Sequence, residues 1–289
     1  MSKVLILGST GMLGLAVVEA FKTFDGEVLS TFRPRAHIED SRGALAFDAE
    51  RNVLDSLAVD WVEGDYIINC IGIIKSEIDE GSPESVHRAK QINTDFSVEL
   101  AQFAEKKGLR VIQIATDCVF SGRDGAYVES SPHDPTDVYG KTKSAGESDS
   151  KNVQHLRVSI IGPENRGFTS LYEWVNHQPR GAEITGYVNH LWNGIPAKHF
   201  GKIARAVIEN NLWVSGTRHI LPKDSVTKAE LVQLIADHLG RSDITVNLGD
   251  GPDTIDRTLS SEHKQYNRLV WFHAGYPDVP TIAQLVDEI

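Results

Sequence analysis

A glycine-rich turn directly after a short apolar run is the feature that most restricts how this chain can fold. The run Val4-Leu-Ile-Leu7 leads into Gly8-Ser-Thr-Gly-Met-Leu-Gly14, with a glycine at every third position. Between a strand and a helix, the first glycine permits a tight bend, the second lets backbone approach a phosphate, and the third lets the helix pack closely on the strand. The turn therefore predicts a dinucleotide site at a helix N-terminus, built from Gly8, Ser9, Thr10, Gly11, Met12, Leu13 and Gly14.

Short β-branched apolar runs alternate with longer amphipathic segments through the first half of the chain. Strands are expected at residues 4–7, 27–31, 45–47, 66–71, 111–115 and 154–161. Helices are expected between them, at 13–23, 52–57, 84–107 and 138–148. Apolar strands joined by helical crossovers predict the α/β class, with a doubly wound parallel sheet of the Rossmann type that is covered on both faces.

The pattern loosens after residue 161. Gly, Pro, Asn and Trp gather in a probable loop at 186–196, followed by expected helices at 197–209 and 227–239 and short strands near 219–221 and 244–246. We expect 1–161 to form the dinucleotide-binding domain and 162–289 to form a smaller C-terminal substrate lobe, some of whose segments can return to the sheet. Ligands of open α/β sheets bind at the carboxyl edge, so the active site is expected in the cleft between the two.

Composition excludes several classes of function. The net charge of −11 over 289 residues argues against a general binder of nucleic acid or of an anionic membrane, because both need clustered positive charge. The chain has neither a secretory h-region at its start nor an apolar run near the roughly 20 residues of a membrane helix. Its two cysteines, Cys70 and Cys118, suggest no disulfide framework. We expect a cytoplasmic protein.

Tyr139 and Lys143 are the residues that point to a reaction. They are four positions apart in an expected helix, and this spacing puts both side chains on one face. An ammonium beside a phenol favours the phenolate, which makes the proton easier to transfer near neutral pH. Thr116 ends a central strand and is placed to orient a substrate carbonyl toward Tyr139. A Tyr-x-x-x-Lys spacing alone is weak, but after a glycine turn and a strand-end threonine it indicates carbonyl/alcohol redox chemistry on a nicotinamide.

The choice of cofactor depends on the end of the second strand. An acidic residue there would bind the ribose hydroxyls of NAD, whereas an arginine can pair with the 2′-phosphate of NADP. The segment has Arg33 and Arg35 and no carboxylate, which favours NADP(H). Two solvated surface arginines are the alternative. Asp48, at the end of the third strand, can either bind the adenine amino group or close a turn.

The fourth strand leads into Asn69-Cys-Ile-Gly72, where the backbone of Cys70, Ile71 and Gly72 is expected to approach the cofactor. Asn69 is better placed to tie strands together. Asn93 lies in the long expected helix on a stretch that faces the sheet. We expect it near the cofactor, most simply in hydrogen bonds to backbone beside the site.

These residues resemble the extended short-chain dehydrogenases/reductases, and among them the dTDP-4-dehydrorhamnose reductase family of sugar-nucleotide reductases. The matching stretches are 8–14, 115–122 and 138–147, with weaker matches at 69–72, 192–194 and 256–261. The resemblance implies an NAD(P)-dependent oxidoreductase acting on CH–OH, with Thr116, Tyr139 and Lys143 as the catalytic trio. In that family NAD(P)H reduces the C4 ketone of a nucleotide-linked 6-deoxyhexose for polysaccharide biosynthesis. Tyr139 then donates the proton, while Lys143 lowers the pKa of the tyrosine and holds the nicotinamide ribose.

Two departures concern the sugar pocket. The family usually has an aromatic residue where this chain has Cys118, and a tryptophan after the sixth strand, which this chain lacks at 157–161. The substrate can therefore differ from the rhamnose precursor. Tyr187, Trp192 and Asn193 could supply replacement contacts to substrate, or could pack the lobe. A homodimer is compatible with the family, and we see no metal-ligand spacing.

Three alternative functions follow from the same residues. A nucleotide-sugar 4,6-dehydratase is disfavoured, because that class has a glutamate where this chain has Cys118. A nucleotide-sugar epimerase uses the same Tyr/Lys pair and stays open. A non-catalytic, NADP-binding regulatory subunit also stays open, because the β subunit of methionine adenosyltransferase resembles the same reductase family.

Overall fold

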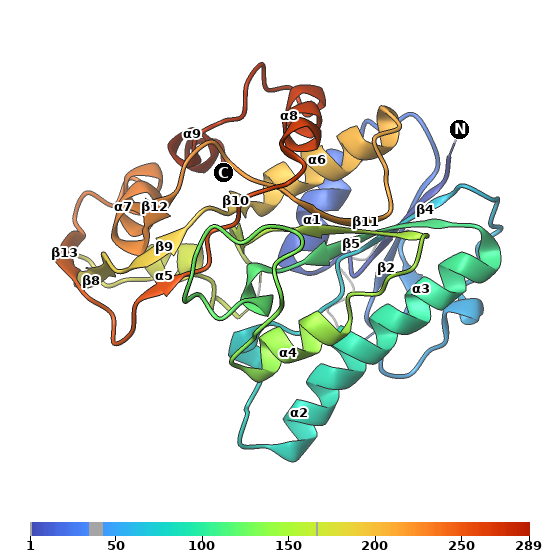
Figure 1. The fold of residues 1–289 in the computed structure, drawn as a ribbon, viewed down its shortest axis with the longest axis horizontal. Coiled ribbons are helices and arrows are strands. Elements are labelled where there is room, and N and C mark those ends of the chain that lie inside the picture. Colours follow the sequence, from blue (N-terminus) through green and yellow to red (C-terminus); the bar gives the residue numbers. More distant parts are fainter. Residues whose placement is uncertain (1, 35–42, 166) are drawn as a thin grey trace.

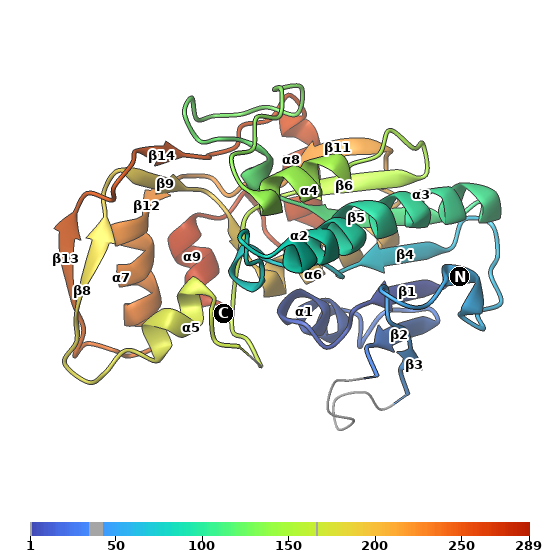
Figure 2. The ribbon, with the colours of Figure 1, turned by 90° about the horizontal axis from the view of Figure 1, so that it is seen from below.

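The computed structural model describes residues 2–34, 43–165 and 167–289. Its largest element is a parallel sheet of seven strands in the described part of the chain (Figures 1 and 2). Along the sheet these are β11 (Gly216–His219), β6 (Val153–Arg157), β5 (Arg110–Ala115), β4 (Tyr66–Asn69), β1 (Val4–Leu7), β2 (Val28–Phe32) and β3 (Leu45–Ala46). The order reverses between β1 and β4, where doubly wound sheets bind their ligands. The predicted Rossmann-type fold is confirmed.

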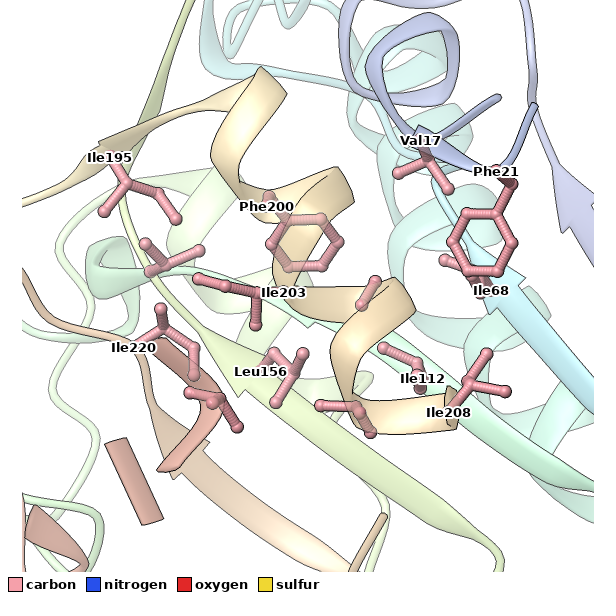
Figure 3. Close-up of a cluster of buried hydrophobic side chains, with 14 of the residues drawn as sticks. Val17, Phe21, Ile68, Ile112, Leu156, Ile195, Phe200, Ile203, Ile208 and Ile220 are labelled. Carbon is pink, nitrogen blue, oxygen red and sulfur yellow. The ribbon is translucent and has the colours of Figure 1, made fainter. Parts of the chain in front are cut away.

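Alternate side chains of each strand enter separate cores on the two faces of the sheet. Val4 and Ile6 of β1 join the core under α1 (Met12–Ala20), α6 (Ala197–Glu209) and α8 (Lys264–His273), part of which Figure 3 shows. Leu5 and Leu7 join the opposite core, under α3 (Phe96–Lys107) and the short 3-10 helix η2 (Leu54–Ser56). Burial on both faces explains why the strand reads as an unbroken apolar run.

The long crossover between β4 and β5 is helical, with a widened turn in its middle. After the 3-10 helix η3 (Lys75–Glu77), helix α2 (Pro83–Lys90) starts at a Ser82 cap and passes through a π-helical turn, η4 (Gln91–Asp95), into α3. A single helix at 84–107 was the sequence expectation, and periodicity alone does not reveal the π turn. Such turns often occur at functional sites.

A second lobe has its own core. It contains α5 (Leu171–Asn176), β8 (Glu183–Tyr187), β9 (His190–Trp192), β12 (Val226–Thr227), α7 (Lys228–His238), β13 (Thr245–Gly249), β14 (Ile255–Asp256) and α9 (Ile282–Asp287). Trp192, Ile184 and Leu231 are among its buried residues. Figure 1 shows this lobe beside the sheet, with β8 and β13 at its outer end.

The chain passes back from the second lobe to the sheet. Helix α6 packs on α1, β11 pairs with β6, and α8 covers the same face. The expected strand at 154–161 is two strands, β6 and β7 (Ile160–Ile161), and β7 pairs with β10 (Ile195–Pro196). Strand β8 was missed by sequence reasoning because only two of its five residues, Ile184 and Gly186, are buried.

Candidate active site at the carboxyl edge of the sheet

Both ends of the glycine turn, Gly8 and Gly14, have the geometry that the spacing predicts. Gly8 has a φ of +77°, a conformation that other residues rarely adopt. A Cβ on Gly14 would lie 2.1 Å from the carbonyl oxygen of Gly8, so only glycine lets α1 pack this closely. Ser9 fixes the turn to β2, because its backbone N and its Oγ both donate to the carbonyl oxygen of Thr31, at 2.9 and 2.8 Å.

The start of α1 can hold an anion. Gly11 precedes Met12 as the N-cap, no described side chain caps it, and the first turn carries no acidic residue. The N–H groups of that turn therefore lack intrahelical partners and point toward any bound phosphate. A Cβ on Gly11 would meet the Gly8 carbonyl oxygen only at 3.8 Å, so the space above it is open. Thr10, Met12 and Leu13 are partly exposed around this opening, and the residues present fit a dinucleotide pyrophosphate.

The end of β4 lies directly against the glycine turn. A Cβ on Gly8 would lie 2.8 Å from Cγ1 of Ile71, and the backbone N of Cys70 donates to the Leu7 carbonyl at 3.0 Å. Asn69 donates to Oε1 of Gln113 at 2.8 Å and so ties β4 to β5, as expected from the sequence.

Asn93 lies in the π turn and is buried. Its Oδ1 accepts from the backbone N of Ile73 at 2.9 Å, and its Nδ2 donates to the Ile73 carbonyl at 3.0 Å and to Thr142 Oγ1 at 3.2 Å. The amide therefore fixes the backbone just beyond Gly72 against α4 (Val138–Ala145).

Arg33 follows β2 and shares a carboxylate with a second arginine that sequence reasoning missed. Nη1 of Arg33 lies 3.8 Å from Oε1 of Glu50, and both Nε and Nη2 of Arg88 lie 2.8 Å from the same oxygen. Half of the Arg33 side chain is exposed, which leaves its guanidinium accessible to a phosphate. Arg88 comes from α2, so only the fold brings it here. Arg35 lies outside the described residues.

Asp48 closes the turn after β3. Its Oδ1 accepts from the backbone N of Glu50 at 3.1 Å, and its Oδ2 lies 3.8 Å from Nε of Arg51. The carboxylate is buried. These contacts match the turn role that was one of its two interpretations.

Tyr139 is positioned by the first turn of α4. Asp137 caps this helix by accepting from the backbone N of Gly140 at 2.7 Å, and it also binds Nζ of Lys75 at 2.8 Å. A Cβ on Gly140 would lie 2.2 Å from the carbonyl oxygen of Cys118. Glycine after Tyr139 therefore lets α4 rest on the 3-10 turn η5 (Asp117–Val119) that follows β5.

Thr116, Tyr139 and Lys143 come together at this point. Thr116 caps η5, with its Oγ1 accepting from the backbone N of Cys118 at 3.2 Å. The Thr116 hydroxyl acts to lower the pKa of the Tyr139 phenol. Nζ of Lys143, a buried residue, donates to the carbonyl oxygen of Ile114 at 3.0 Å. The three residues thus line one end of β5 and the facing side of α4.

The electrostatics of the pair differ from the sequence expectation. Burial raises the pKa of Tyr139, and Cys118 and Asp117 raise it further, so the net shift is upward rather than downward. Burial lowers the pKa of Lys143 to about 8, against the opposing effect of Glu147. The spacing correctly predicted a shared face, but it could not predict how far the fold withdraws both groups from water.

Two cations from the second lobe lie near Asp117, the residue after Thr116, and were not predicted as site residues. Burial raises the pKa of Asp117, while Arg257 and Lys228 act to lower it. Nε of Arg257 donates to the Phe120 carbonyl at 2.9 Å, and Nζ of Lys228 lies 5.4 Å from the centre of the Trp192 ring. The Arg257 segment had matched the family only weakly, and Lys228 carried no sequence signal.

The three proposed substrate contacts have different surroundings. Trp192 is buried and donates from Nε1 to Ser159 Oγ at 2.9 Å. Asn193 binds the backbone of Leu259 through both ends of its amide, at 2.7 and 2.9 Å. Tyr187 is exposed on β8 and packs against the ring of His190, with centroids 4.9 Å apart. The contacts of Trp192 and Asn193 are thus made within the protein, and the Trp192 ring also contacts Lys228.

Neither a metal centre nor a membrane span emerges from the described residues. None of their His, Cys, Asp and Glu side chains gather in threes that could ligate a metal. Within the same residues, no helix has the length and apolarity needed to cross a bilayer.

Comparison with known proteins connects this geometry to a family. The family model of the RmlD substrate binding domain matches residues 2–248. The methionine adenosyltransferase 2 subunit beta of Danio rerio is 30% identical over 253 residues, which cover 81% of this chain and 73% of that protein. A probable low-salt glycan biosynthesis reductase of Haloferax volcanii is 26% identical over 248 residues, covering 81% and 79%.

A solved structure shares the fold. The dTDP-4-dehydrorhamnose reductase of Bacillus anthracis, in complex with NADP, superposes with a TM-score of 0.72 at 18% identity and covers 100% of this chain and 97% of that one. At this identity the likeness concerns the arrangement of the elements.

Proposed function

Because this chain belongs to the RmlD substrate-binding-domain family of extended short-chain dehydrogenases/reductases, we propose that it reduces the keto group of a nucleotide-linked deoxy-sugar with NADPH. The family expected from the sequence is thereby confirmed. The observation that carries the proposed reaction is the meeting of Thr116, Tyr139 and Lys143 at the carboxyl edge, beside the uncapped start of α1.

The chain's own residues suit a dinucleotide in three places. The N–H groups of the first turn of α1, from Met12 on, have no intrahelical partner, and the open space at Gly11 is where a pyrophosphate would be held. Arg33 and Arg88 offer two guanidinium groups at the end of β2, which favours the 2′-phosphate of NADP over a bare ribose. Lys143, next to the end of β5, would bind the nicotinamide ribose. When bound, the reduced nicotinamide supplies the hydride for the keto carbon.

Tyr139 supplies the proton in this proposal. Its raised pKa keeps the phenol protonated at neutral pH, which is the state that a general acid needs. Thr116 orients the carbonyl oxygen toward the phenol, and Tyr139 passes its proton to that oxygen as the C–H bond forms. The ammonium of Lys143 stabilises the phenolate that remains. The keto group becomes an alcohol. The π electron pair of the C=O bond forms the new O–H bond with the proton from Tyr139.

The positive charges of Lys228 and Arg257 would suit a substrate that carries a pyrophosphate. Both cations come from the second lobe and lie close to Asp117, which follows β5 of the sheet. Cys118 argues against a dehydratase, because burial raises the pKa of its thiol to about 12 and leaves it neutral at physiological pH. A neutral thiol is a poor acid/base for the elimination step.

The test is turnover with NADPH and a panel of nucleotide-linked 4-keto-sugars. We expect one NADPH to be oxidised per sugar reduced, followed as loss of NADPH absorbance. Tyr139→Phe should slow turnover by about 10²–10⁴-fold while NADPH still binds. Tyr266→Phe, which removes a phenol hydroxyl on α8, is the matched control and should keep its rate. Sugar interconversion without net NADPH oxidation would identify an epimerase instead.

A regulatory subunit is the second candidate, because a subunit beta of methionine adenosyltransferase is 30% identical to this chain. The retention of Thr116, Tyr139 and Lys143 together favours catalysis. Mixing the protein with a methionine adenosyltransferase catalytic subunit separates the two functions. Sedimentation of a stable complex, together with no NADPH oxidation across the panel, would support the regulatory role.

A further inference from the structure

Glu147 lies between two hollows, two residues beyond the end of α4. On one side is a narrow gap, too small for a water molecule, that is lined by Lys143, Ile114, Asn93 and Glu147 itself. On the other side is a polar cavity of about 400 Å³ that reaches the solvent. Glu147 therefore lines both the dry gap beside the buried Lys143 and the cavity that reaches the solvent.

One oxygen of the carboxylate is fixed and the other is free. Oε2 of Glu147 accepts from Nη2 of Arg157 at 2.5 Å, and Arg157 is 1% exposed. The other guanidinium nitrogen of Arg157, Nη1, lies 2.9 Å from Nε2 of His219. Oε1 of Glu147 is buried and has no hydrogen-bond partner among the described residues. Because no donor is bound to this oxygen, its negative charge can attract a neighbouring cation.

Lys143 is the neighbour that this charge affects. The ammonium has a single described hydrogen bond, to the Ile114 carbonyl, and it is buried. Burial lowers the pKa of Lys143, and Glu147 is the anion that acts against this. Because the gap between them is dry, water does not screen the attraction.

We propose that Glu147, anchored by Arg157, is a positioning residue that keeps Lys143 in its ammonium form during the reaction. The proposal rests on the proposed function, in which that ammonium binds the nicotinamide ribose and stabilises the phenolate. Other titratable groups around the pair are the imidazoles of His133, His155 and His219 and, lining the open cavity, the carboxylates of Glu129 and Asp149. Burial lowers the pKa of each of these imidazoles, so all three are neutral near pH 7 and do not replace the charge of Glu147.

The first measurement is independent of catalysis. Protein labelled with ¹³Cε-lysine is titrated by NMR, and the Lys143 resonance is identified by its loss in Lys143→Arg. We expect a midpoint near 8 in the wild type. In Glu147→Gln the midpoint should fall by about one pH unit or more, because an anion at this range favours the charged form. Glu129→Gln, which removes another carboxylate of the same cavity, is the control and should leave the midpoint in place.

The second measurement is the pH profile of kcat/KM. The rate should fall as pH rises through the Lys143 midpoint, and in Glu147→Gln this alkaline limb should move to lower pH with the midpoint. Glu147→Asp, which keeps the charge, should recover part of the shift. A midpoint that does not move would overturn the proposal, as would a midpoint that moves while the alkaline limb stays.

A control for folding and a control for function keep the outcomes separate. Glu147→Gln leaves Arg157 as an uncompensated buried cation, so the double variant Glu147→Gln/Arg157→Met is made as well. It removes both charges and must still lower the Lys143 midpoint. If no keto-sugar is turned over by the wild type, the proposed function fails, whereas the NMR midpoint still decides whether Glu147 controls the charge of Lys143.

Discussion

Tyr139 and Lys143 lie about one helical turn apart, and their pKa values are shifted in opposite directions. Burial raises the pKa of the phenol and lowers the pKa of the ammonium to about 8. At neutral pH both groups are therefore protonated, which is the state that carbonyl reduction requires. Both groups are withdrawn from water, so a small change in a neighbouring charge can shift the pKa of either one.

Arg33 should decide between the two nicotinamide cofactors. Its guanidinium is half exposed next to Arg88, and a 2′-phosphate would gain charge-assisted hydrogen bonds from it. Arg33→Ala should raise the Kd for NADPH about tenfold or more and change the Kd for NADH about twofold at most. Fluorescence titration with each cofactor measures both. Arg268→Ala, an exposed charge on α8, is the control, and equal effects on the two cofactors would remove Arg33 from the phosphate site.

Helix α4 carries both Tyr139 and Lys143, so its position sets the geometry of the candidate site. Among the contacts that hold it are the Asp137 cap, the close approach of Gly140 to the backbone of Cys118, and the hydrogen bond from Asn93 in the π turn to Thr142. The first is readable from the sequence as a capping residue before a helix. The other two join segments that are distant along the chain.

Gly140→Ala tests the placement of α4. The added Cβ would lie 2.2 Å from the Cys118 carbonyl oxygen, so the helix must move away from η5. We expect a loss of about 1–3 kcal/mol in the free energy of unfolding and a fall in kcat of about 100-fold, because small misplacements of catalytic groups are costly. Urea unfolding and steady-state kinetics measure the two. Lys141→Ala, at an exposed position one residue on, should change neither, and an unchanged kcat in Gly140→Ala would contradict the close contact.

The two lobes are joined by strand pairing and by one partly exposed carboxylate. Strand β7 from the end of the first domain pairs with β10, and Glu288 near the C-terminus reaches α6. Its Oε2 accepts from Tyr276 Oη at 2.6 Å and from Lys202 Nζ at 3.0 Å. Helix α9, just before Glu288, belongs to the core of the second lobe, so this carboxylate connects that lobe to the helices that cover the sheet.

Glu288 should make stability depend on acid pH. Partial burial raises its pKa, but hydrogen bonds from Tyr276 and Lys202 outweigh burial and bring the pKa to about 2. A carboxylate with a lowered pKa stabilises the fold above its unfolded pKa, and the contribution disappears as pH falls toward 2. Glu288→Gln should therefore lose about 1 kcal/mol at pH 7, measured by urea unfolding, with the difference shrinking at acid pH. Asp287→Asn is the control, and a difference independent of pH would contradict the assignment.

Short-range spacing is sufficient to predict much of this protein. The glycine turn, the alternation of strands and helices, and the shared face of Tyr139 and Lys143 depend on neighbouring residues, whose geometry is set by the backbone periods of 2 and 3.6 residues. Crossovers of one hand restrict the possible orders of the strands, and the tertiary structure sets the order that is observed.

Contacts between distant segments are decided only by the tertiary structure. Arg88 and Arg33 meet at the carboxylate of Glu50. Lys228 and Arg257 lie close to Asp117. Glu147 lies across a dry gap from Lys143. The roles of Trp192 and Asn193 and the upward pKa shift of Tyr139 have the same origin. Burial and long-range charge depend on what the whole chain packs around a group, and no local pattern in the sequence records that.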